Sequence, residues 1–222
     1  MEIVLAAATP FEIQPVLEAL EKQAGTVTDH RISPLITGVG SVAATWALMR
    51  HLRSGGPDLI IQAGIAGTLR DKPPGTVFVV GEETMADTGV WEEGRFRDVF
   101  DLKLAGPNTL PFSGGRLVNP WRRLLELTGL EAVGGLTVNE ITTHPERIKW
   151  YQQNTTAVVE SMEGGALHYV CLQENMPFLQ LRAVSNAVGV RDKMKWDIRG
   201  AISRLNEVLI ELLKNPKLEE QR

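Results

Sequence analysis

The sequence predicts an α/β sandwich, in which helices cover both faces of a β-sheet. Strand-like apolar runs alternate with helical segments along the 222 residues, which is the pattern of a helix-covered sheet. Several of these runs are continuously apolar, as in strands that are buried on both faces. Hydrophobic residues make up 43% of the chain, and no linker or repeat divides it. We therefore expect one domain over residues 1–222.

The composition argues against several classes of function. The net charge is −4 and no basic cluster is present, unlike in proteins that bind a nucleic-acid backbone. Cys171 is the only cysteine and lies in an apolar run, so we expect a buried free thiol rather than a disulfide or a metal ligand. The sequence shows no signal peptide and no apolar run of ~18 residues. We expect a cytoplasmic protein without nucleic-acid or membrane partners.

The first predicted strand leads directly into a helix. Ile3–Ala8 is an apolar run typical of a central strand, and the helix then extends to about Lys22. Thr9 is a good N-cap, Pro10 suits the first helical position, and Glu12 has the spacing of a capping box. A carboxylate at a helix start is stabilising in any protein. Glu12 therefore has a structural explanation beside any catalytic one.

Two segments rich in small residues follow strands. The strand at Leu35–Thr37 enters a helix at Val42–Leu52 through Gly38–Ser41, a turn that can direct N–H groups at a ligand. Ala43 occupies the position of the third glycine of a dinucleotide fingerprint, so we expect no nucleotide cofactor. The next strand, Leu59–Gln62, ends in Ala63–Gly67, where a ligand can approach the backbone closely. Tight packing would explain this second segment equally well.

The middle of the chain contains a charged, aperiodic stretch from Glu82 to Phe100, which predicts a loop or a hairpin. Its aromatic residues alternate with Arg95 and Arg97, and it could cover a site or simply pack on the surface. His144 has no companion at metal-ligand spacing, and we expect no metal site. The regular elements predicted in this region are strands at 76–80 and 132–138 and helices at 120–130 and after Pro145.

The segment from Ala157 to Asn186 carries the strongest functional signal. Strands at 155–159 and 178–184 flank a short helix at 166–171, which predicts a βαβ unit with a parallel strand pair. Ligands of parallel sheets bind at the carboxyl ends of strands, where Glu163 and Asn186 would both emerge. Asn186 could alternatively serve only a turn at the strand end. An amphipathic helix at 199–214 closes the chain.

Together these segments resemble the purine nucleoside phosphorylase and nucleosidase superfamily over nearly the whole chain. The most specific parts are the Met162-Glu163 pair and the segment from Arg182 to Asn186. Within the superfamily the chain is most similar to the hydrolytic branch that contains the methylthioadenosine/S-adenosylhomocysteine nucleosidases and, most of all, the futalosine hydrolases of the menaquinone pathway. The resemblance implies a three-layer sandwich with a central mixed, twisted sheet, no cofactor, and a homodimer or higher homo-oligomer.

The resemblance also implies roles for individual residues. Glu12 matches the general base that takes a proton from the attacking water. Glu163 matches the carboxylate that holds the ribose hydroxyls, and a carboxylate can accept both hydrogen bonds of a cis-diol. The other positions that would line the substrate are Ala66, Gly67, Met162 and Ser185.

The resemblance places Asn186 where adenine-specific relatives have aspartate. An asparagine amide can donate to O6 of a 6-oxopurine and accept from N7–H, so this position predicts hypoxanthine or guanine as the base. The phosphorylases use an arginine and a hydroxyl residue to bind phosphate. Gln62 and Ile65 stand at the matching positions, so we expect water as the nucleophile. A methylthioadenosine/S-adenosylhomocysteine-type nucleosidase, a phosphate-dependent purine nucleoside phosphorylase and a catalytically silent purine-binding protein remain as alternatives.

Overall fold

The computed structural model describes residues 1–22, 28 and 30–221, and its centre is an eight-stranded mixed sheet. The strand order is β10-β4-β8-β9-β3-β1-β2, with β7 beside β4, and β10 also pairs with β3. This second pairing curls one part of the sheet into a closed, barrel-like ring. The strands are β1 (Glu2–Ala7), β2 (Arg31–Ile36), β3 (Leu59–Thr68), β4 (Val77–Met85), β7 (Leu117–Val118), β8 (Ala132–Thr137), β9 (Ala157–Ser161) and β10 (Phe178–Ala187).

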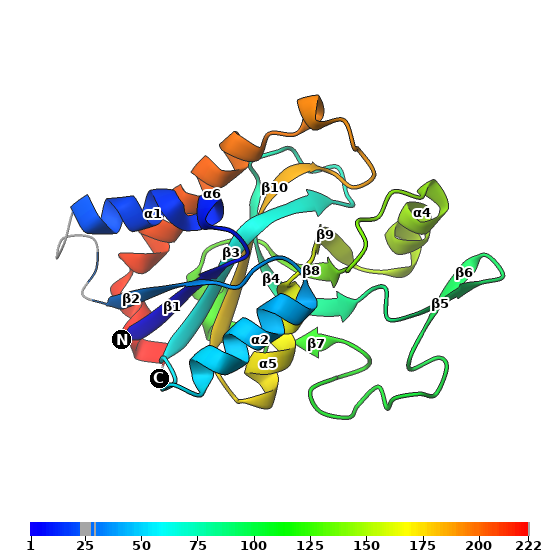
Figure 1. The fold of residues 1–222 in the computed structure, drawn as a ribbon, viewed down its shortest axis with the longest axis horizontal. Coiled ribbons are helices and arrows are strands. Elements are labelled where there is room, and N and C mark those ends of the chain that lie inside the picture. Colours follow the sequence, from blue (N-terminus) through cyan, green and yellow to red (C-terminus); the bar gives the residue numbers. More distant parts are fainter. Residues whose placement is uncertain (23–27, 29, 222) are drawn as a thin grey trace.

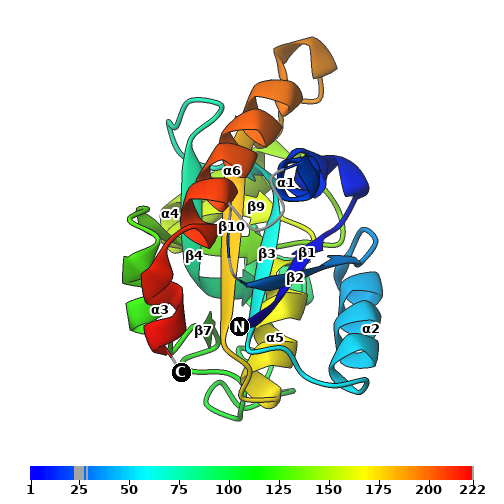
Figure 2. The same ribbon diagram turned by 90° about the vertical axis from the view of Figure 1, so that its left-hand side faces the viewer.

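Helices cover both faces of the sheet, as predicted. In Figures 1 and 2, α1 and α6 lie together on one face, and α2 and α5 lie together on the other. The helices are α1 (Pro10–Lys22), α2 (Ser41–Leu52), α3 (Arg122–Leu127), α4 (Pro145–Asn154), α5 (Gly164–Gln173) and α6 (Ile198–Leu213), with 3-10 turns at Lys193–Lys195 and Pro216–Gln221. No helix in the described part of the chain has the length and apolar character needed to span a membrane.

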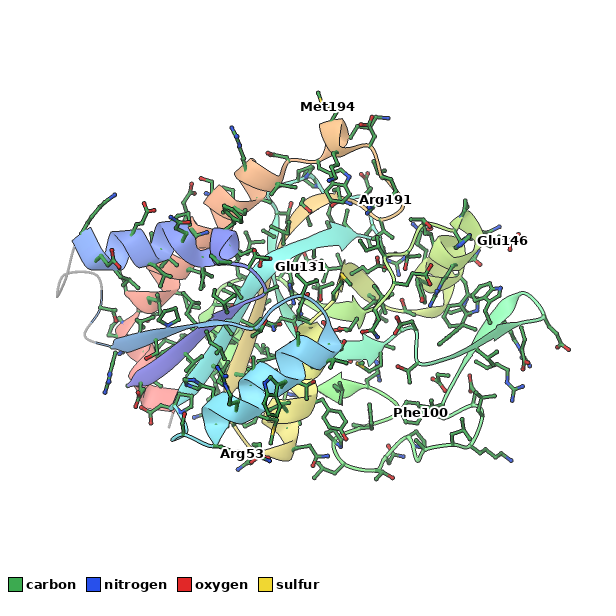
Figure 3. All side chains as sticks on the ribbon, in the orientation of Figure 1. Arg53, Phe100, Glu131, Glu146, Arg191 and Met194 are labelled. Carbon is green, nitrogen blue, oxygen red and sulfur yellow. The ribbon has the colours of Figure 1, made fainter. Side chains whose placement is uncertain are left out.

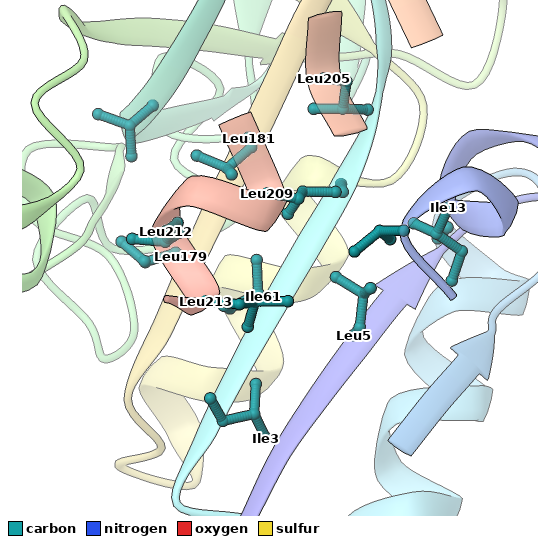
Figure 4. Packing of buried hydrophobic residues seen from close by; sticks show 14 of the residues in the cluster. Ile3, Leu5, Ile13, Ile61, Leu179, Leu181, Leu205, Leu209, Leu212 and Leu213 are labelled. Atoms are coloured by element: carbon teal, nitrogen blue, oxygen red, sulfur yellow. The ribbon is translucent and has the colours of Figure 1, made fainter. Parts of the chain in front are cut away.

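The largest core cluster lies between the sheet and the α1/α6 layer. Leu5 of β1 and Ile61 of β3 are fully buried, and so are Leu205 and Leu209 on the inner face of α6 (Figure 4). Each such side chain contributes on the order of 1.5–3 kcal/mol by leaving water. Because β1 and β3 are buried on both faces, the continuous apolar runs of the sequence predicted them correctly.

The prediction of a parallel βαβ pair from β9 and β10 is wrong. Both strands pair with β3, but β10 is parallel to it and β9 is antiparallel. The overlap of β9 with β3 is confined to Gly67–Thr68 opposite Val159–Glu160. The carboxyl ends of the three strands still meet. The prediction that Glu163 and Asn186 lie near the same edge of the sheet is therefore correct, although the predicted strand pairing is not.

Other boundaries differ for identifiable reasons. β3 continues through Ala63–Gly67 to Thr68, because this segment pairs with β10 on one side and is joined by β9 at its end. The predicted helix at 120–130 shrinks to Arg122–Leu127, since Pro120 precedes it and Gly129 has a positive φ of 65°. The stretch after Glu82 first extends β4 and then forms a hairpin of β5 (Gly89–Glu92) and β6 (Arg95–Asp98).

Candidate functional site

A cavity of about 480 Å³ lies where the carboxyl ends of β1, β3, β9 and β10 meet. Its wall contains every residue that the sequence predicted for the site. These are Glu12, Ala66, Gly67, Met162, Glu163, Ser185 and Asn186. Glu12, Ala66, Glu163 and Ser185 are buried, and Gly67, Met162 and Asn186 are half-buried. The structure thus brings together residues that lie up to 174 positions apart (186 − 12) in the chain.

Glu12 makes the helix-start contact that its sequence position predicted, and it also lines the cavity. Its Oε2 accepts hydrogen bonds from the Thr9 backbone N–H at 2.9 Å and from the Thr9 hydroxyl at 3.1 Å, which is the predicted helix-start contact. Its Oε1 accepts from the backbone N–H of Ile65 at 3.1 Å. These three hydrogen bonds hold the buried carboxylate in one orientation at the cavity wall. An ionised carboxylate can accept about four hydrogen bonds in all. One acceptor position therefore remains for a bound water.

Glu163 lies at the N-cap of α5, but its side chain makes no capping hydrogen bond to its own helix. Its Oε1 instead accepts from the backbone N–H of Gly40 at 3.1 Å, in the turn before α2. Its Oε2 lies 3.5 Å from Nη1 of Arg182. The Gly38–Ser41 turn thus binds this carboxylate with its backbone N–H, which is the anion-binding use of such a turn that the sequence indicated.

Arg182 is the main component of the site that the sequence analysis did not assign. It is 1% exposed and lies on β10 between the two carboxylates. Its Nη2 donates to Oε1 of Gln62 at 3.0 Å. The available signal was an arginine within a mostly apolar strand, because an arginine that such a strand buries must be paired.

Gly64 allows Arg182 and Glu12 to approach β3. A Cβ at this position would lie 2.5 Å from Nη1 of Arg182 and 2.8 Å from Oε1 of Glu12. Only glycine fits, because both groups are held by other bonds and cannot retreat cheaply. The small-residue segment of the sequence therefore serves close approach by charged side chains of the protein itself.

Ser185 and Asn186 form a second polar group in the wall. The Ser185 hydroxyl contacts Oδ1 of Asn186 at 2.8 Å and the carbonyl oxygen of Ala66 at 3.2 Å. Nδ2 of Asn186 donates to the carbonyl oxygen of Ala187 at 2.9 Å, which leaves its second hydrogen for a ligand. The register of β10 against β3 shifts between Val184 and Asn186, and this bulge sets the direction of the amide.

Met162 and Gly67 complete the predicted set. The Met162 carbonyl accepts from the Ser41 hydroxyl at 3.2 Å, which ties the end of β9 to the start of α2. A Cβ on Gly67 would come within 2.9 Å of Cγ2 of Val188, so the residue leaves no spare volume beside the Asn186 amide. Glu160, which is 7% exposed, is a further carboxyl in the wall; burial raises its pKa, and the contacts with Thr142 lower it in part.

The hairpin of β5 and β6 does not line this cavity, so the interpretation that it covers the site is wrong for the single chain. Its Phe96 packs against Trp150 of α4, and Arg97 forms an ion pair with Glu92. The cationic side chains in the cavity wall are Arg191, on the loop after β10 as Figure 3 shows, and Arg199 on α6.

The arrangement suits the activation of a water molecule beside a polar ligand. The buried carboxyl groups of Glu12, Glu160 and Glu163 face a cavity that is otherwise lined mainly by apolar and small side chains, and the Asn186 amide is available at the other polar group. Glu12 can accept a proton, Glu163 can accept hydrogen bonds from hydroxyl groups, and Asn186 can both donate and accept. Among the residues that the structure describes, no group of acidic, histidine or cysteine side chains could hold a metal ion.

Comparison with known proteins gives relatives over nearly the whole chain. Futalosine hydrolase of Thermus thermophilus is 32% identical over 184 residues, which cover 81% of this chain and 80% of the relative. Futalosine hydrolase of Streptomyces coelicolor is 31% identical over 225 residues, which cover 94% of each chain. Both alignments exceed two thirds of the relative's length.

Solved structures agree with the fold. A putative 5'-methylthioadenosine/S-adenosylhomocysteine nucleosidase from Francisella philomiragia superimposes with a TM-score of 0.79 at 20% identity, covering 96% of this chain and 99% of the other. The sequence model of the phosphorylase superfamily matches residues 2–214. The chain therefore belongs to the phosphorylase superfamily.

Proposed function

We propose that this protein hydrolyses the N-ribosidic bond of futalosine and releases hypoxanthine and dehypoxanthine futalosine, a step of menaquinone biosynthesis. The observation that carries the proposal is the carboxylate of Glu12, which is held by Thr9 and Ile65 at the cavity wall, where it can accept a proton from water. The relatives that are 31–32% identical are named futalosine hydrolase, which supports this substrate.

In the proposed reaction, water attacks C1′ of the ribosyl group while Glu12 takes its proton. The new bond joins the water oxygen to C1′, and the bond from C1′ to N9 breaks. Its electron pair leaves with hypoxanthine, which gains a proton at N7 from solvent. Glu163 binds the ribose hydroxyls and favours the positive charge that develops on the ring, and Asn186 accepts from N7–H and donates to O6.

Water is favoured over phosphate by the charges around Glu12. The positions that matched the phosphate ligands are Gln62, which is uncharged, and Ile65, which presents its backbone N–H to Glu12. Arg182 is a buried cation nearby, but its guanidinium already contacts Glu163 and Gln62. A phosphate dianion there would meet Glu12 as a like charge.

Hydrolysis is tested by measuring base release from futalosine, inosine and methylthioadenosine, each with and without phosphate. We expect hypoxanthine to be released from futalosine at the same rate in both conditions, and adenine release from methylthioadenosine to be slower. Strict dependence on phosphate would favour the phosphorylase alternative. Binding of hypoxanthine without turnover of any substrate would favour a purine-binding protein.

We also propose that Arg191 and Arg199 bind the benzoate-bearing 5′ group of futalosine. Both arginines line the cavity, and a carboxylate that is partly removed from water needs a cationic partner. The guanidinium of Arg191 lies 5.4 Å from the centre of the Trp196 ring, which restricts the positions it can take. Neither arginine has an ion pair within the described residues.

Replacing both Arg191 and Arg199 by glutamine should raise KM for futalosine about tenfold and leave KM for inosine nearly unchanged, because only futalosine carries the benzoate. Steady-state kinetics with the two substrates measure this. Arg97→Gln is the matched control, since Arg97 lies on the hairpin and not in the cavity wall. Equal effects of the double substitution on both substrates would refute the assignment.

Residues 1–222 are proposed to form a single nucleosidase-like domain, supported by one sheet that contains strands from both ends of the chain. A homodimer or higher homo-oligomer is proposed as well. Its support is the apolar outer side of α2, where Val42 is 83% exposed and Trp46 is 65% exposed. This surface lies directly after the Gly40 turn that binds Glu163.

A further inference from the structure

A buried polar cluster lies behind the active site, on the side of Glu163 that faces the sheet. Its centre is the carboxyl group of Glu83 on β4, which is 0% exposed. Oε2 of Glu83 accepts from the Thr137 hydroxyl of β8 at 2.9 Å, and Oε1 contacts Nε2 of Gln180 on β10 at 2.8 Å. None of these residues lines the cavity, and the reaction scheme above uses none of them.

The cluster contacts the backbone that immediately follows Glu163. A Cβ at Gly164 would lie 2.2 Å from Oε1 of Glu83, so the carboxyl group rests directly against the first residue of α5. The next backbone N–H, of Gly165, donates to the Thr137 hydroxyl at 2.6 Å. Glu83 therefore supports the turn that carries Glu163, directly at Gly164 and through Thr137 at Gly165.

Two buried atoms of the cluster lack hydrogen-bond partners in this arrangement. They are Oε1 of Gln180 and Nε2 of His168, which lies on α5 and is 0% exposed. The other ring nitrogen, Nδ1 of His168, lies 2.9 Å from the carbonyl oxygen of Leu117 and must donate to it. In a neutral imidazole Nε2 is then an acceptor, so the Gln180 oxygen cannot satisfy it. Buried polar groups without partners are costly.

Rotating the Gln180 amide by 180° removes both defects, provided that Glu83 carries a proton. Nε2 of Gln180 then donates to Nε2 of His168, and the Gln180 oxygen accepts from the protonated Oε1 of Glu83. The bonds of Thr137 to Glu83 and of His168 to Leu117 are unchanged. Every polar atom of the cluster is satisfied without any buried charge, which is the arrangement that a low-dielectric interior favours.

We propose that Glu83 is a positioning residue that carries a proton in the active enzyme, where its neutral carboxyl group holds the start of α5 and keeps a second anion away from Glu163. The proposal rests on the proposed function, because it assigns Glu163 to the ribose. It predicts that ionisation of Glu83 impairs the enzyme in two ways: it breaks the bond to Gln180 in the rotated arrangement, and it opposes the charge on Glu163.

The ionisation behaviour of the cluster agrees with this assignment. Burial raises the pKa of Glu83 to about 7, although the hydrogen bonds from Gln180 and Thr137 and the charge of Arg182 lower it; the charge of Glu163 raises it further. Burial lowers the pKa of His168 to about 4, which keeps the ring neutral. The charged groups that act on Glu83 are thus Glu163 at the N-cap of α5 and Arg182 from β10, while β8 contributes the uncharged Thr137.

The pH dependence of kcat tests the proposal. For the wild type, kcat on futalosine should fall at least about tenfold between pH 6 and pH 9, because the protonated fraction of a group with a pKa near 7 falls tenfold per pH unit at high pH. Glu83→Gln imitates the neutral carboxyl group, so its kcat at pH 6 should stay within about threefold of the wild-type value. Its kcat should not decrease between pH 6 and pH 9 as that of the wild type does. Glu83→Ala should lower kcat at every pH, since it removes the support of α5.

The matched control is Glu82→Gln, on the neighbouring residue of β4, whose side chain is 25% exposed and pairs with Arg116. It should retain the wild-type pH profile. The proposal is wrong if kcat of Glu83→Gln falls at high pH with the same midpoint as kcat of the wild type, because Glu83 would then not cause the fall. It is also wrong if Glu83→Gln remains folded but its kcat at pH 6 is more than about thirtyfold below the wild-type value, because Glu83 would then act as an anion.

A second measurement does not depend on the substrate. The pKa of Glu83 is higher in the folded state than its unfolded value of 4.5. Between pH 4.5 and pH 7, the folded state therefore retains a proton that the unfolded chain has already released. The stability of the wild type relative to Glu83→Gln should therefore be greatest below pH 4.5 and decline as the pH rises through 7. His168 is present in both proteins and cancels in this difference.

The two measurements separate the possible failures. If the wild type releases no hypoxanthine from futalosine, the proposed function fails, and the stability difference still decides whether Glu83 is protonated in the folded chain. A stability difference that is constant or that increases with pH would overturn the assignment of the proton to Glu83. Denaturant unfolding at a series of pH values gives this difference directly.

Discussion

Replacing Glu163 by glutamine is expected to lower kcat by ~10²-fold or more, because the substitution removes a negative charge that acts in the transition state. The amide retains one oxygen for the Gly40 N–H, but it loses the negative charge that faces the developing ribosyl cation. It also leaves Arg182 without its carboxylate partner. The expected loss is in kcat rather than only in KM, since the charge acts mainly in the transition state.

Glu12→Gln should give a loss of similar size for a different reason, because an amide cannot take a proton from water. The matched control is Glu18→Gln in the same helix, whose carboxylate is exposed and pairs with Lys22. Single-turnover kinetics and thermal unfolding should be measured together. If Glu12→Gln lowers only the melting temperature and retains the wild-type kcat, Glu12 is a capping residue and not a base.

A large effect of another kind is expected for Asn186→Asp, which should change the preference between 6-oxopurine and 6-aminopurine substrates by ~10²-fold or more. An aspartate at this position places an anion beside O6 of hypoxanthine, whereas it accepts well from the 6-amino group of adenine. A mismatched hydrogen-bonding edge in a desolvated pocket costs several kcal/mol. The Ser185 hydroxyl can donate to the new carboxylate as it does to Oδ1 of Asn186, so the local fold should be retained.

The preference is measured as the ratio of kcat/KM for futalosine to kcat/KM for its adenine counterpart, aminofutalosine, in both proteins. Asn154→Asp, at the exposed end of α4, is the control for the charge change alone. A wild type that already prefers aminofutalosine, or a ratio that Asn186→Asp leaves unchanged, would mean that Asn186 does not contact the base. The choice of futalosine would then lose its main chemical support.

The residues of the site could be predicted from the sequence because each lies near the carboxyl end of a strand or at the start of a helix. Glu12 is an example: the capping-box spacing placed it at the start of α1, and the contact with Ile65 then came from the neighbouring end of β3. Glu163 follows β9 and precedes α5, and Asn186 is the second-last residue of β10. Positions at element ends depend mostly on local pattern, so the sequence alone indicated them.

Long-range pairing was less predictable. The direction of β9 against β3 depends on an overlap of only two residue pairs, which no local pattern encodes, and the parallel βαβ prediction failed for that reason. Arg182 was missed because its partners Gln62 and Glu163 become neighbours only in the folded sheet. The sequence predicted a loop or a hairpin where β5 and β6 form, but it did not predict the contact with Trp150 of α4, which places the hairpin away from the cavity.

The central claim is that water attacks the ribosyl carbon with Glu12 as the base, and oxygen-18 labelling tests it most directly. The reaction should be run on futalosine in labelled water that contains phosphate, and the sugar product analysed by mass spectrometry together with a phosphate assay. The account predicts that each sugar product initially carries one labelled oxygen at C1′ and that no sugar phosphate forms. A sugar 1-phosphate product without the label would contradict it.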